Sequence, residues 1–228
     1  MGDETIRIFS LGDSALTVEF GNTISTTLNK KAIALSNFFE HNPFPGFVES
    51  VPAYASITIF YDLVETRKSF PEFSTAFETV KNLAKEAISN LDSSQTETPR
   101  IVEIPVHFDN ESALDLHIIA QKNGISHEKV IEVFTTTTYR VFMLGFLPGF
   151  SYMGEVDDRI ATPRKETPRT NVPKGSVGIA GKQTGIYSLA SPGGWQIVGR
   201  TEVEMFKPNE ENPSFLQAGD LVRFIAAS

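Results

Sequence analysis

The chain has 228 residues, of which 40% are hydrophobic and 21% are charged, so it is long enough and apolar enough to bury a globular core. It contains no cysteine, which excludes a disulfide framework, a thiolate metal site and a cysteine nucleophile. Its formal net charge of −8 disfavours nucleic acid and anionic membranes as partners, and the lack of a secretory signal or of an apolar run of about 18 residues predicts a cytoplasmic protein.

The N-terminal part of the chain alternates between strand and helix patterns. Leu16, Val18 and Phe20 alternate with polar residues, which is the period of a half-buried strand. In chain order we expect strands over 6–11 and 16–20, a helix from 22 or 23 to 40, a strand over 54–61 and a helix over 72–91. This order predicts a ferredoxin-like α/β sandwich over residues 1–91, closed by a further strand near 101–106.

Residues 92–99 are polar and lack periodicity, so we expect them to form a linker to a second domain over 100–228. That domain begins with a predicted strand over 100–106, followed by a helix over about 113–123 that Gly124 ends. Ser126 is expected to cap the next helix. The four threonines over 135–138 are β-branched and favour extended backbone.

The character of the chain changes beyond Gly145. Short apolar segments alternate with turns rich in glycine and proline, and we expect strands over 176–180, 186–190, 196–201 and 221–226. This pattern is typical of a compact, mostly antiparallel β-barrel. The fold class is therefore predicted to be α+β, with a sandwich followed by a barrel.

Several self-contained catalytic motifs are missing from the sequence. It has no phosphate loop, no Gly-x-Gly-x-x-Gly, no His-Glu-x-x-His and no Gly-x-Ser-x-Gly. The four histidines lack ligand spacing, so we expect no metal site and give structural or solvent roles to His41, His107, His117 and His127. These absences favour a protein that completes a site on another chain of a complex.

A basic segment over 159–182 stands out in this acidic protein. Only Glu166 opposes its six cations, which are Arg159, Arg164, Lys165, Arg169, Lys174 and Lys182. The segment either presents charge to a small anion or is a solvated loop whose charges pair with acids elsewhere in the chain. The sequence leaves both interpretations open.

The block over 145–201 surrounds this segment with glycine, proline and aromatic residues. Gly145, Pro148 and Gly149 define a turn, because glycine permits positive φ and proline restricts φ. Rigid backbone N–H groups beside rings and cations suit a carboxylate or a phosphate. In the alternative interpretation, glycine and proline only turn corners, and the rings fill the core of the barrel.

The same block resembles the signature of a known family. The motifs are Leu-Gly-Phe-Leu-Pro-Gly-Phe-Ser-Tyr-Met-Gly over 144–154, the Ala-Thr-Pro-Arg run over 161–169, Val-Pro-Lys-Gly-Ser-Val-Gly-Ile-Ala-Gly over 172–181, and Ser-Pro-Gly-Gly-Trp-Gln-Ile-Val-Gly-Arg-Thr over 191–201. They are similar to those of the family of allophanate hydrolase subunit 1, the KipI-type proteins and the B subunit of bacterial 5-oxoprolinase. Gly12–Leu16 and Pro52–Tyr54 resemble its N-terminal half. Three positions depart from the family pattern: Phe134 stands at an often-histidine position, and Ser188 and Glu202 at positions that are usually proline.

The resemblance implies a ferredoxin-like N-terminal domain and a cyclophilin-like β-barrel at the C-terminus. It also implies a 5-oxoprolinase complex in which the B subunit, a homologous C subunit and an A subunit hydrolyse the lactam of 5-oxo-L-proline to L-glutamate with ATP. ATP with Mg²⁺ would bind this chain or one of its partners. The alternatives are a KipI-type module that inhibits a histidine kinase and a carboxyltransferase component of a urea or allophanate pathway enzyme.

Lactam activation needs cations against phosphate and donors at the developing oxyanion. For a small-molecule substrate or phosphate, the candidate cations are Arg164, Arg169, Lys174 and Lys182, and the candidate donors are Gln183, Thr184, Ser191 and the backbone of Gly193 and Gly194. The expected pocket wall comprises Phe146, Phe150, Tyr152, Tyr187 and Trp195. The sequence names no general base.

Overall fold

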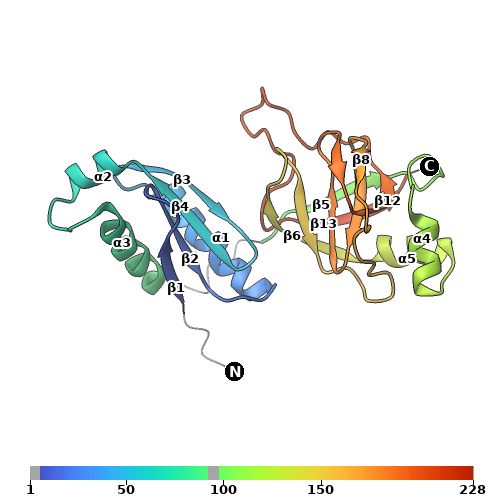
Figure 1. Ribbon diagram of the computed structural model, residues 1–228, viewed down its shortest axis with the longest axis horizontal. Coiled ribbons are helices and arrows are strands. Elements are labelled where there is room, and N and C mark those ends of the chain that lie inside the picture. Colours follow the sequence, from blue (N-terminus) through green and yellow to red (C-terminus); the bar gives the residue numbers. More distant parts are fainter. Residues whose placement is uncertain (1–5, 92–97, 228) are drawn as a thin grey trace. The chain divides into compact units, whose positions relative to one another are not determined.

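The structure is a computed structural model that describes residues 6–91 and 98–227 (Figure 1). The chain divides into two compact units, residues 1–98 and 99–228, and each mixes helices with strands, as the predicted α+β class requires. The division falls at the end of the predicted linker, of which residues 92–97 lie outside the described residues. No helix in the described part of the chain is both long and apolar enough to cross a bilayer.

The first unit contains a four-stranded antiparallel sheet. Its strands, in the order in which they lie side by side, are β1 (Arg7–Ser10), β2 (Ala15–Glu19), β4 (Ser56–Tyr61) and β3 (Phe47–Pro52). Alternate residues of β4 are buried, because one face of the sheet is covered and the other is not. Ile57, Ile59 and Tyr61 point to the covered face, as their spacing predicted.

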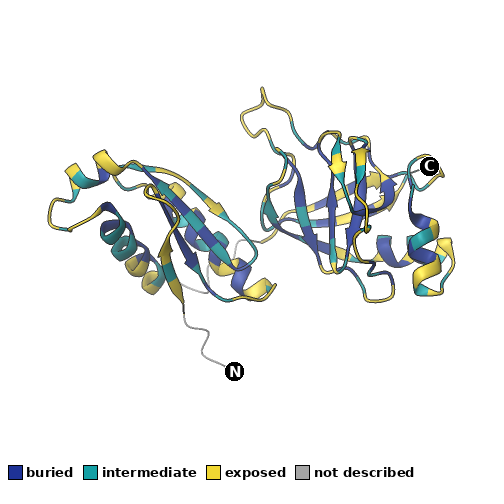
Figure 2. Cartoon of the chain, in the orientation of Figure 1, coloured by how far each residue is buried: buried dark blue, intermediate teal, exposed yellow. Residues whose placement is uncertain are grey.

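Helices supply the cover of this sheet. They are α1 (Thr26–His41), α2 (Leu63–Ser69) and α3 (Ala76–Asn90). The apolar stripe of α1 and the buried residues of α3 join the sheet in one hydrophobic cluster (Figure 2). Two helices begin at side-chain caps, because Asp62 accepts a hydrogen bond from Glu65 N and Thr75 accepts one from Glu78 N.

Three expectations for this unit were wrong or incomplete. The strand expected near 101–106 does not close its sheet, because Ile101–Val106 pairs within the second unit. The fourth strand is instead β3, which was not predicted because the prolines at 43 and 45 shortly before it indicated a turn. The helix α2 was not predicted either. Because the expected closing strand lies elsewhere, the ferredoxin-like assignment stays a prediction.

The second unit is built on a seven-stranded sheet. In spatial order its strands are β12 (Gln196–Arg200), β9 (Ser176–Ala180), β10 (Gln183–Ile186), β7 (Ser151–Gly154), β6 (Thr138–Leu144), β13 (Leu221–Ala226) and β5 (Ile101–Val106). The pairs are antiparallel except for β13 with β5, which run parallel. The strand predicted over 186–190 lies earlier in the chain, as β10.

The two edge strands of this sheet approach one another. His107, directly after β5, forms a β-bridge with Arg200 at the end of β12, through backbone hydrogen bonds of 2.8 and 3.0 Å. The sheet therefore curls into a nearly closed barrel around an aliphatic core, the interior cluster, in which Val141, Met153 and Ile179 are fully buried. The predicted barrel architecture is confirmed at this level.

Two helices precede the glycine-rich block: α4 (Leu116–Asn123) and α5 (His127–Thr136). The predicted ends are confirmed, since Gly124 has a φ of 66° at the end of α4 and the Ser126 side chain caps α5. The expected extended backbone over 135–138 was wrong for Thr135 and Thr136. Their hydroxyls donate to the carbonyls of Ile131 and Glu132, four residues earlier, at 2.8 and 2.7 Å, which satisfies them within the helix.

Candidate functional site

Two glycines facing each other on neighbouring strands create a bare patch on the outside of the barrel. Gly178 of β9 pairs with Gly185 of β10, and both point away from the interior cluster because Val177 and Ile179 point into it. A Cβ added at Gly178 would lie 2.9 Å from Trp195 Cβ, and one added at Gly185 would lie 3.0 Å from Phe150 Cζ. Only glycine therefore lets the two rings lie directly on the sheet.

The rings on this patch form a second hydrophobic core, which we call the outer cluster. Its buried members are Phe150, Val172, Ala180, Tyr187, Trp195 and Ile197. Ring centroids are 5.6 Å apart for Phe150 and Trp195 and 5.3 Å apart for Phe150 and Tyr187, both edge-to-face. The interpretation that rings fill a core thus applies to three predicted wall residues, while Tyr152 is half-buried and Phe146 is 60% exposed.

A short ribbon and a loop cover the outer cluster. The ribbon consists of β8 (Arg169–Val172) and β11 (Ser191–Gly193). An added Cβ at Gly193 would lie 2.8 Å from Tyr187 Cε1, so glycine is required for this close approach. Lys165 N donates to Gly194 O at 2.7 Å, which holds the basic loop against the ribbon.

A buried carboxylate holds this cover in place. Asp115 is fully buried, and it accepts hydrogen bonds from both terminal nitrogens of Arg169, each at 2.7 Å, from Lys165 Nζ at 3.1 Å and from Ile197 N at 2.7 Å. Burial raises the pKa of Asp115, but the bonds from Arg169, Ile197 and Lys165 outweigh it, so its pKa is lowered. Asp115 therefore stays ionised and joins α4, the basic loop and β12.

Arg164 is the exception within the basic segment. Its guanidinium lies over the Trp195 ring, 5.8 Å from the centroid, and among the described residues it forms no ion pair with a carboxylate. The other five cations all form such pairs: Arg159 with Asp157, Lys165 and Arg169 with Asp115, Lys174 with Glu204, and Lys182 with Asp158. The interpretation of a charge-paired loop therefore describes most of the segment, and Arg164 is the cation to which it does not apply.

The remaining candidates do not meet at one point. Lys174 precedes β9 and Lys182 follows it, so they lie at opposite ends of that strand. Thr184 is fully buried and donates its hydroxyl to Gly178 O. The Ser191 hydroxyl donates to Pro192 O at 3.3 Å. Gln183 begins β10 and is half-buried.

The group that the structure does bring together is thus smaller than the predicted one. Arg164 lies beside Tyr152 and Tyr187. Burial raises the pKa of both tyrosines above the usual value, and the nearby guanidinium offsets only part of that rise. This cationic edge, consisting of Arg164, Tyr152, Gly193 and Gly194 over the outer cluster, is the candidate functional site.

Sequence reasoning missed the central member of the arrangement. Asp115 lies 50 residues before Lys165 and 54 before Arg169, and it stands at the start of a helix, where an acid commonly serves as a cap. Lys165 was noted in the basic segment but not among the site candidates. No local pattern connects these three residues, because only the tertiary fold brings them together.

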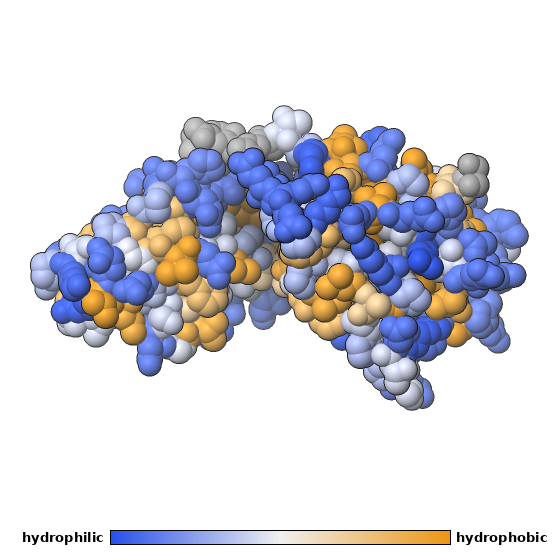
Figure 3. Space-filling model, turned by 90° about the horizontal axis from the view of Figure 1, so that it is seen from above, coloured by the Kyte–Doolittle hydropathy of each residue, from blue (hydrophilic) through white to orange (hydrophobic). Residues whose placement is uncertain are grey.

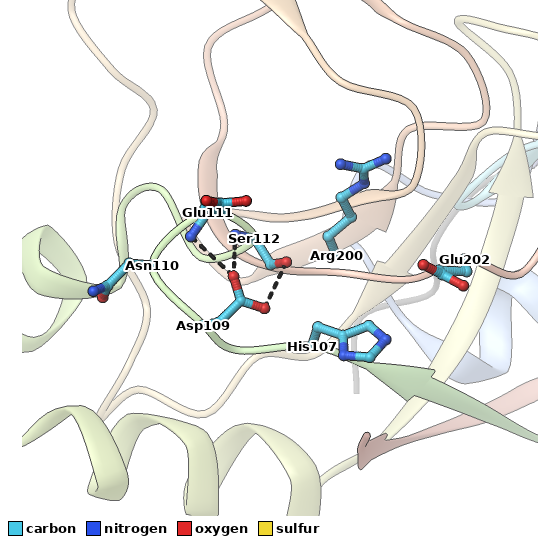
Figure 4. Close-up of a pocket in the computed structure, with 7 residues that line it drawn as sticks. All are labelled: His107, Asp109, Asn110, Glu111, Ser112, Arg200 and Glu202. Carbon is cyan, nitrogen blue, oxygen red and sulfur yellow. Dashed lines mark hydrogen bonds between the residues drawn. The ribbon is translucent and has the colours of Figure 1, made fainter. Parts of the chain in front are cut away.

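A cavity of about 600 Å³ lies elsewhere in this unit, beside the seam of the barrel (Figure 4). Seven polar or charged residues line it: His107, Asp109, Asn110, Glu111, Ser112, Arg200 and Glu202. Asp109 already accepts from Glu111 N, Ser112 N and the Ser112 hydroxyl, and the Arg200 side chain extends away from Asp109. No candidate residue lies here, so we do not take this cavity as the functional site.

Comparison with known proteins matches most of the chain to one family. The family model described as carboxyltransferase domain, subdomain C and D, matches residues 6–216. The match includes most of both units and every residue of the candidate site.

Individual relatives agree with this match. The B subunit of 5-oxoprolinase from Bacillus subtilis (strain 168) is 44% identical over 97% of this chain and 93% of its own length, and that of Escherichia coli O157:H7 is 34% identical over 96% and 95%. A crystal structure of TTHA0988 superposes with a TM-score of 0.80 at 36% identity, covering 98% of this chain. This chain spans 40% of that longer solved chain.

Proposed function

We propose, since this chain belongs to the family of carboxyltransferase domains of the subdomain C and D type, that it acts as the B subunit of a 5-oxoprolinase complex. The observation that carries the proposal is its similarity, over nearly the full length of both chains, to two bacterial proteins with that name. We extend the proposal to a ferredoxin-like first unit, a cyclophilin-like barrel and a cytoplasmic location.

The proposed reaction opens a stable lactam. The amide of 5-oxo-L-proline resists water, so transfer of a phosphoryl group from ATP to the amide oxygen would make its carbon electrophilic. Addition of one water and cleavage of the carbon–nitrogen bond, with a proton passing to the leaving nitrogen, would then give the acyl phosphate of glutamate. A second water would hydrolyse this acyl phosphate to L-glutamate and phosphate, and ADP is the other product. The acceleration must come from groups that stabilise the charge that develops on the oxygen.

This chain is suited to hold the anionic end of that substrate. Arg164 has no carboxylate partner among the described residues, and its five donors can bind a carboxylate at two points. Tyr152 beside it offers a half-buried ring face for the lactam ring. Arg164 is therefore assigned to the substrate carboxylate, and the backbone of Gly193 and Gly194 borders the same edge.

The arrangement does not fit the triphosphate of ATP. Arg169, Lys174 and Lys182 are engaged with carboxylates, and the last two lie at opposite ends of β9. A nucleotide with Mg²⁺ needs several converging cations or a backbone cradle. We therefore place ATP on a partner in the complex, and with it the step that activates the lactam.

The test is release of glutamate from 5-oxo-L-proline and ATP by this chain reconstituted with the homologous C subunit and the A subunit. We expect turnover with all chains present and none when this chain is omitted. Turnover that continues without this chain, or an assembled complex that releases no glutamate, would contradict the proposed function.

The role of Arg164 is tested in the same assay with Arg164→Met. Loss of a charge-assisted bond to a carboxylate is expected to raise KM for 5-oxo-L-proline about tenfold or more, while KM for ATP stays unchanged. Lys129→Met is the matched control, because Lys129 is an exposed cation paired with Glu132 on α5 and lies outside the site. Equal KM values for the two variants would remove Arg164 from the substrate site.

A further inference from the structure

Phe146 combines two unfavourable properties. It is 60% exposed, against 37% for Phe9 and 38% for Phe215, so it leaves a large apolar ring in water. Its φ is 66°, the left-handed region that a non-glycine residue rarely enters. Folding alone would favour neither property, and backbone strain of this kind is found where it serves a function.

The loop around Phe146 is held firmly. Leu147 N donates to Gly145 O at 2.8 Å, so Phe146 is the centre of a γ-turn of the rare form with positive φ. Gly145 N also donates to Phe150 O, at 3.1 Å. A Cβ added at Gly149 would lie 2.6 Å from Met205 O, so the far end of the turn is packed closely against the segment that follows β12.

The ring of Phe146 is also fixed from below. It packs edge-to-face on Phe150 and Tyr187, with centroid distances of 5.4 and 6.4 Å, and both partners are buried. The inner edge of the ring is thus supported by the outer cluster, and the remainder projects from the surface. Phe146 is therefore a rigid apolar projection.

Other exposed apolar residues lie close in sequence to the residues that support Phe146 or to the ribbon that packs on Tyr187. Leu189, two residues after Tyr187, is 40% exposed, and Pro148 and Pro192 are exposed in the turn and the ribbon. Seen from above, the second unit carries hydrophobic patches among hydrophilic residues (Figure 3). We call Phe146, Pro148, Leu189 and Pro192 the apolar knob.

The rings that support the knob also carry a positively charged edge, because Trp195 packs on Phe150 and Arg164 lies over Trp195. Arg164 has no acidic partner among the described residues, and Lys165 and Arg169 share the single carboxylate of Asp115. Even with exposed Glu166 included, one positive charge is in excess here, although the chain as a whole carries −8. An aromatic residue beside an arginine is the typical composition of a binding hot spot.

We infer that the apolar knob docks into an apolar pocket, bordered by carboxylates, on the homologous partner of the proposed complex, and that this contact closes the site around Arg164. The inference rests on the proposed function. It explains why the cationic edge lies open to water in the single chain, where an exposed arginine would bind a carboxylate only weakly. A docked partner would exclude that water and strengthen the bond.

Other binding partners would match the apolar knob less well. A second copy docking through the same patch would bring two locally positive borders together, which opposes association. A small ligand alone would need a recess, and the outer-cluster rings are buried beneath a knob that projects. A partner with an apolar pocket bordered by carboxylates matches both the projecting shape of the knob and the positive charge beside it.

The test measures the affinity of this chain for the purified homologous partner by isothermal titration calorimetry. Phe146→Gly removes the ring while glycine adopts the positive φ without strain, so the loop keeps its shape. Truncation of a hot-spot aromatic is expected to weaken binding about 30-fold or more. Phe146→Tyr keeps the ring and should bind within a few-fold of the native chain.

Phe9→Ala is the matched control, because Phe9 is an exposed phenylalanine of the first unit, and it should leave the affinity unchanged. Native affinity in Phe146→Gly, or failure of the native chain to bind the homologous partner, would overturn the inference. So would a native dimer in sedimentation that Phe146→Gly converts to a monomer, since the knob would then bind a second copy.

Failure of the inference differs from failure of the proposed function. If Phe146→Gly binds normally and the native complex releases glutamate, only the docking assignment is overturned. If the native complex assembles through Phe146 but releases no glutamate, the docking inference is supported and the proposed reaction is wrong.

Discussion

The two hydrophobic clusters of the second unit are built on opposite principles. The interior cluster consists largely of aliphatic residues that alternate along the barrel strands, such as Val177 and Ile179 of β9. The outer cluster lies on the reverse side of the same strands, where Gly178 and Gly185 provide no side chain and large rings fill the space. The interior cluster is built by the regular alternation of aliphatic side chains along the strands. The outer cluster is built where glycines leave room for large rings.

This difference concentrates vulnerability in the outer cluster. Interior packing is spread over many aliphatic contacts, whereas the outer cover depends on Asp115 and on a few glycines. Trp195 is the single tryptophan of the chain and lies in the outer cluster, so its fluorescence reports on that region alone. The two clusters can therefore be disturbed separately and followed with separate probes.

Asp115→Asn should have the largest effect on the stability of the outer cluster relative to the interior cluster. The neutral amide leaves Arg169 and Lys165 without their carboxylate, and breaking a buried pair costs about 3 kcal/mol or more in the free energy of unfolding. Urea unfolding followed by Trp195 fluorescence and by circular dichroism measures this loss. We expect the fluorescence transition to occur at lower urea than the circular dichroism transition, because the cover opens first.

The control for this variant is Asp109→Asn, which changes an exposed carboxylate that bonds only within its own turn. Its unfolding should stay close to that of the native chain. If Asp115→Asn proved equally harmless, Asp115 would not hold the cover, and the proposed separation between the two clusters would be wrong.

Gly185→Ala should have the next largest effect. The added methyl would lie 2.6 Å from Ser151 O and 3.0 Å from Phe150 Cζ, and the backbone carbonyl cannot move aside easily. Overpacking of this kind costs about 1–3 kcal/mol in the free energy of unfolding, which thermal unfolding can measure. Gly145→Ala is the matched variant, because its methyl meets only Met143 Cε at 3.5 Å. Equal melting temperatures would show that the bare patch is not needed.

Acid should have the smallest effect, and it tests the contribution of the charge on Asp115 to stability. The pKa of Asp115 is lower in the folded chain than its usual value of 3.8, so the folded state favours the ionised form. This stabilisation is complete well above that value and is lost as the pH falls through it towards the folded pKa. Between about pH 5 and pH 2, stability should therefore fall more steeply for the native chain than for Asp115→Asn. Parallel slopes would contradict the lowered pKa.

Local pattern was sufficient for much of the fold. Periodicity located α1, α3, β4 and β13, and capping residues located the end of α4 and the start of α5, because these signals lie within a few residues of the elements they define. Which strands pair with one another could not be predicted in this way, because pairing depends on residues far apart in the sequence. Ile101–Val106 has the same apolar pattern whether it closes one unit or begins the other, and only its pairing with β13 decides.

The candidate site was predicted in part, for a related physical reason. Glycine, proline and aromatic content indicated the correct block, and Arg164 and Trp195 do lie together in it. Which cations remain available depends on acids far along the chain, such as Asp115 for Arg169 and Glu204 for Lys174. Charge pairing of this kind carries no local signal, so the sequence alone overstated the number of available cations.

The position of β13 has a consequence for how the protein is made. This strand lies between β6 and β5 in the sheet, and its first residue, Leu221, pairs with Ile101 of β5, although more than half of the chain separates them. On the ribosome the first unit can fold once its own residues have emerged, but the barrel cannot close until residue 226 is synthesised. During that interval β5 and β6 expose unpaired edges. We therefore expect chaperones to bind, or aggregation to begin, while the second unit is still incomplete.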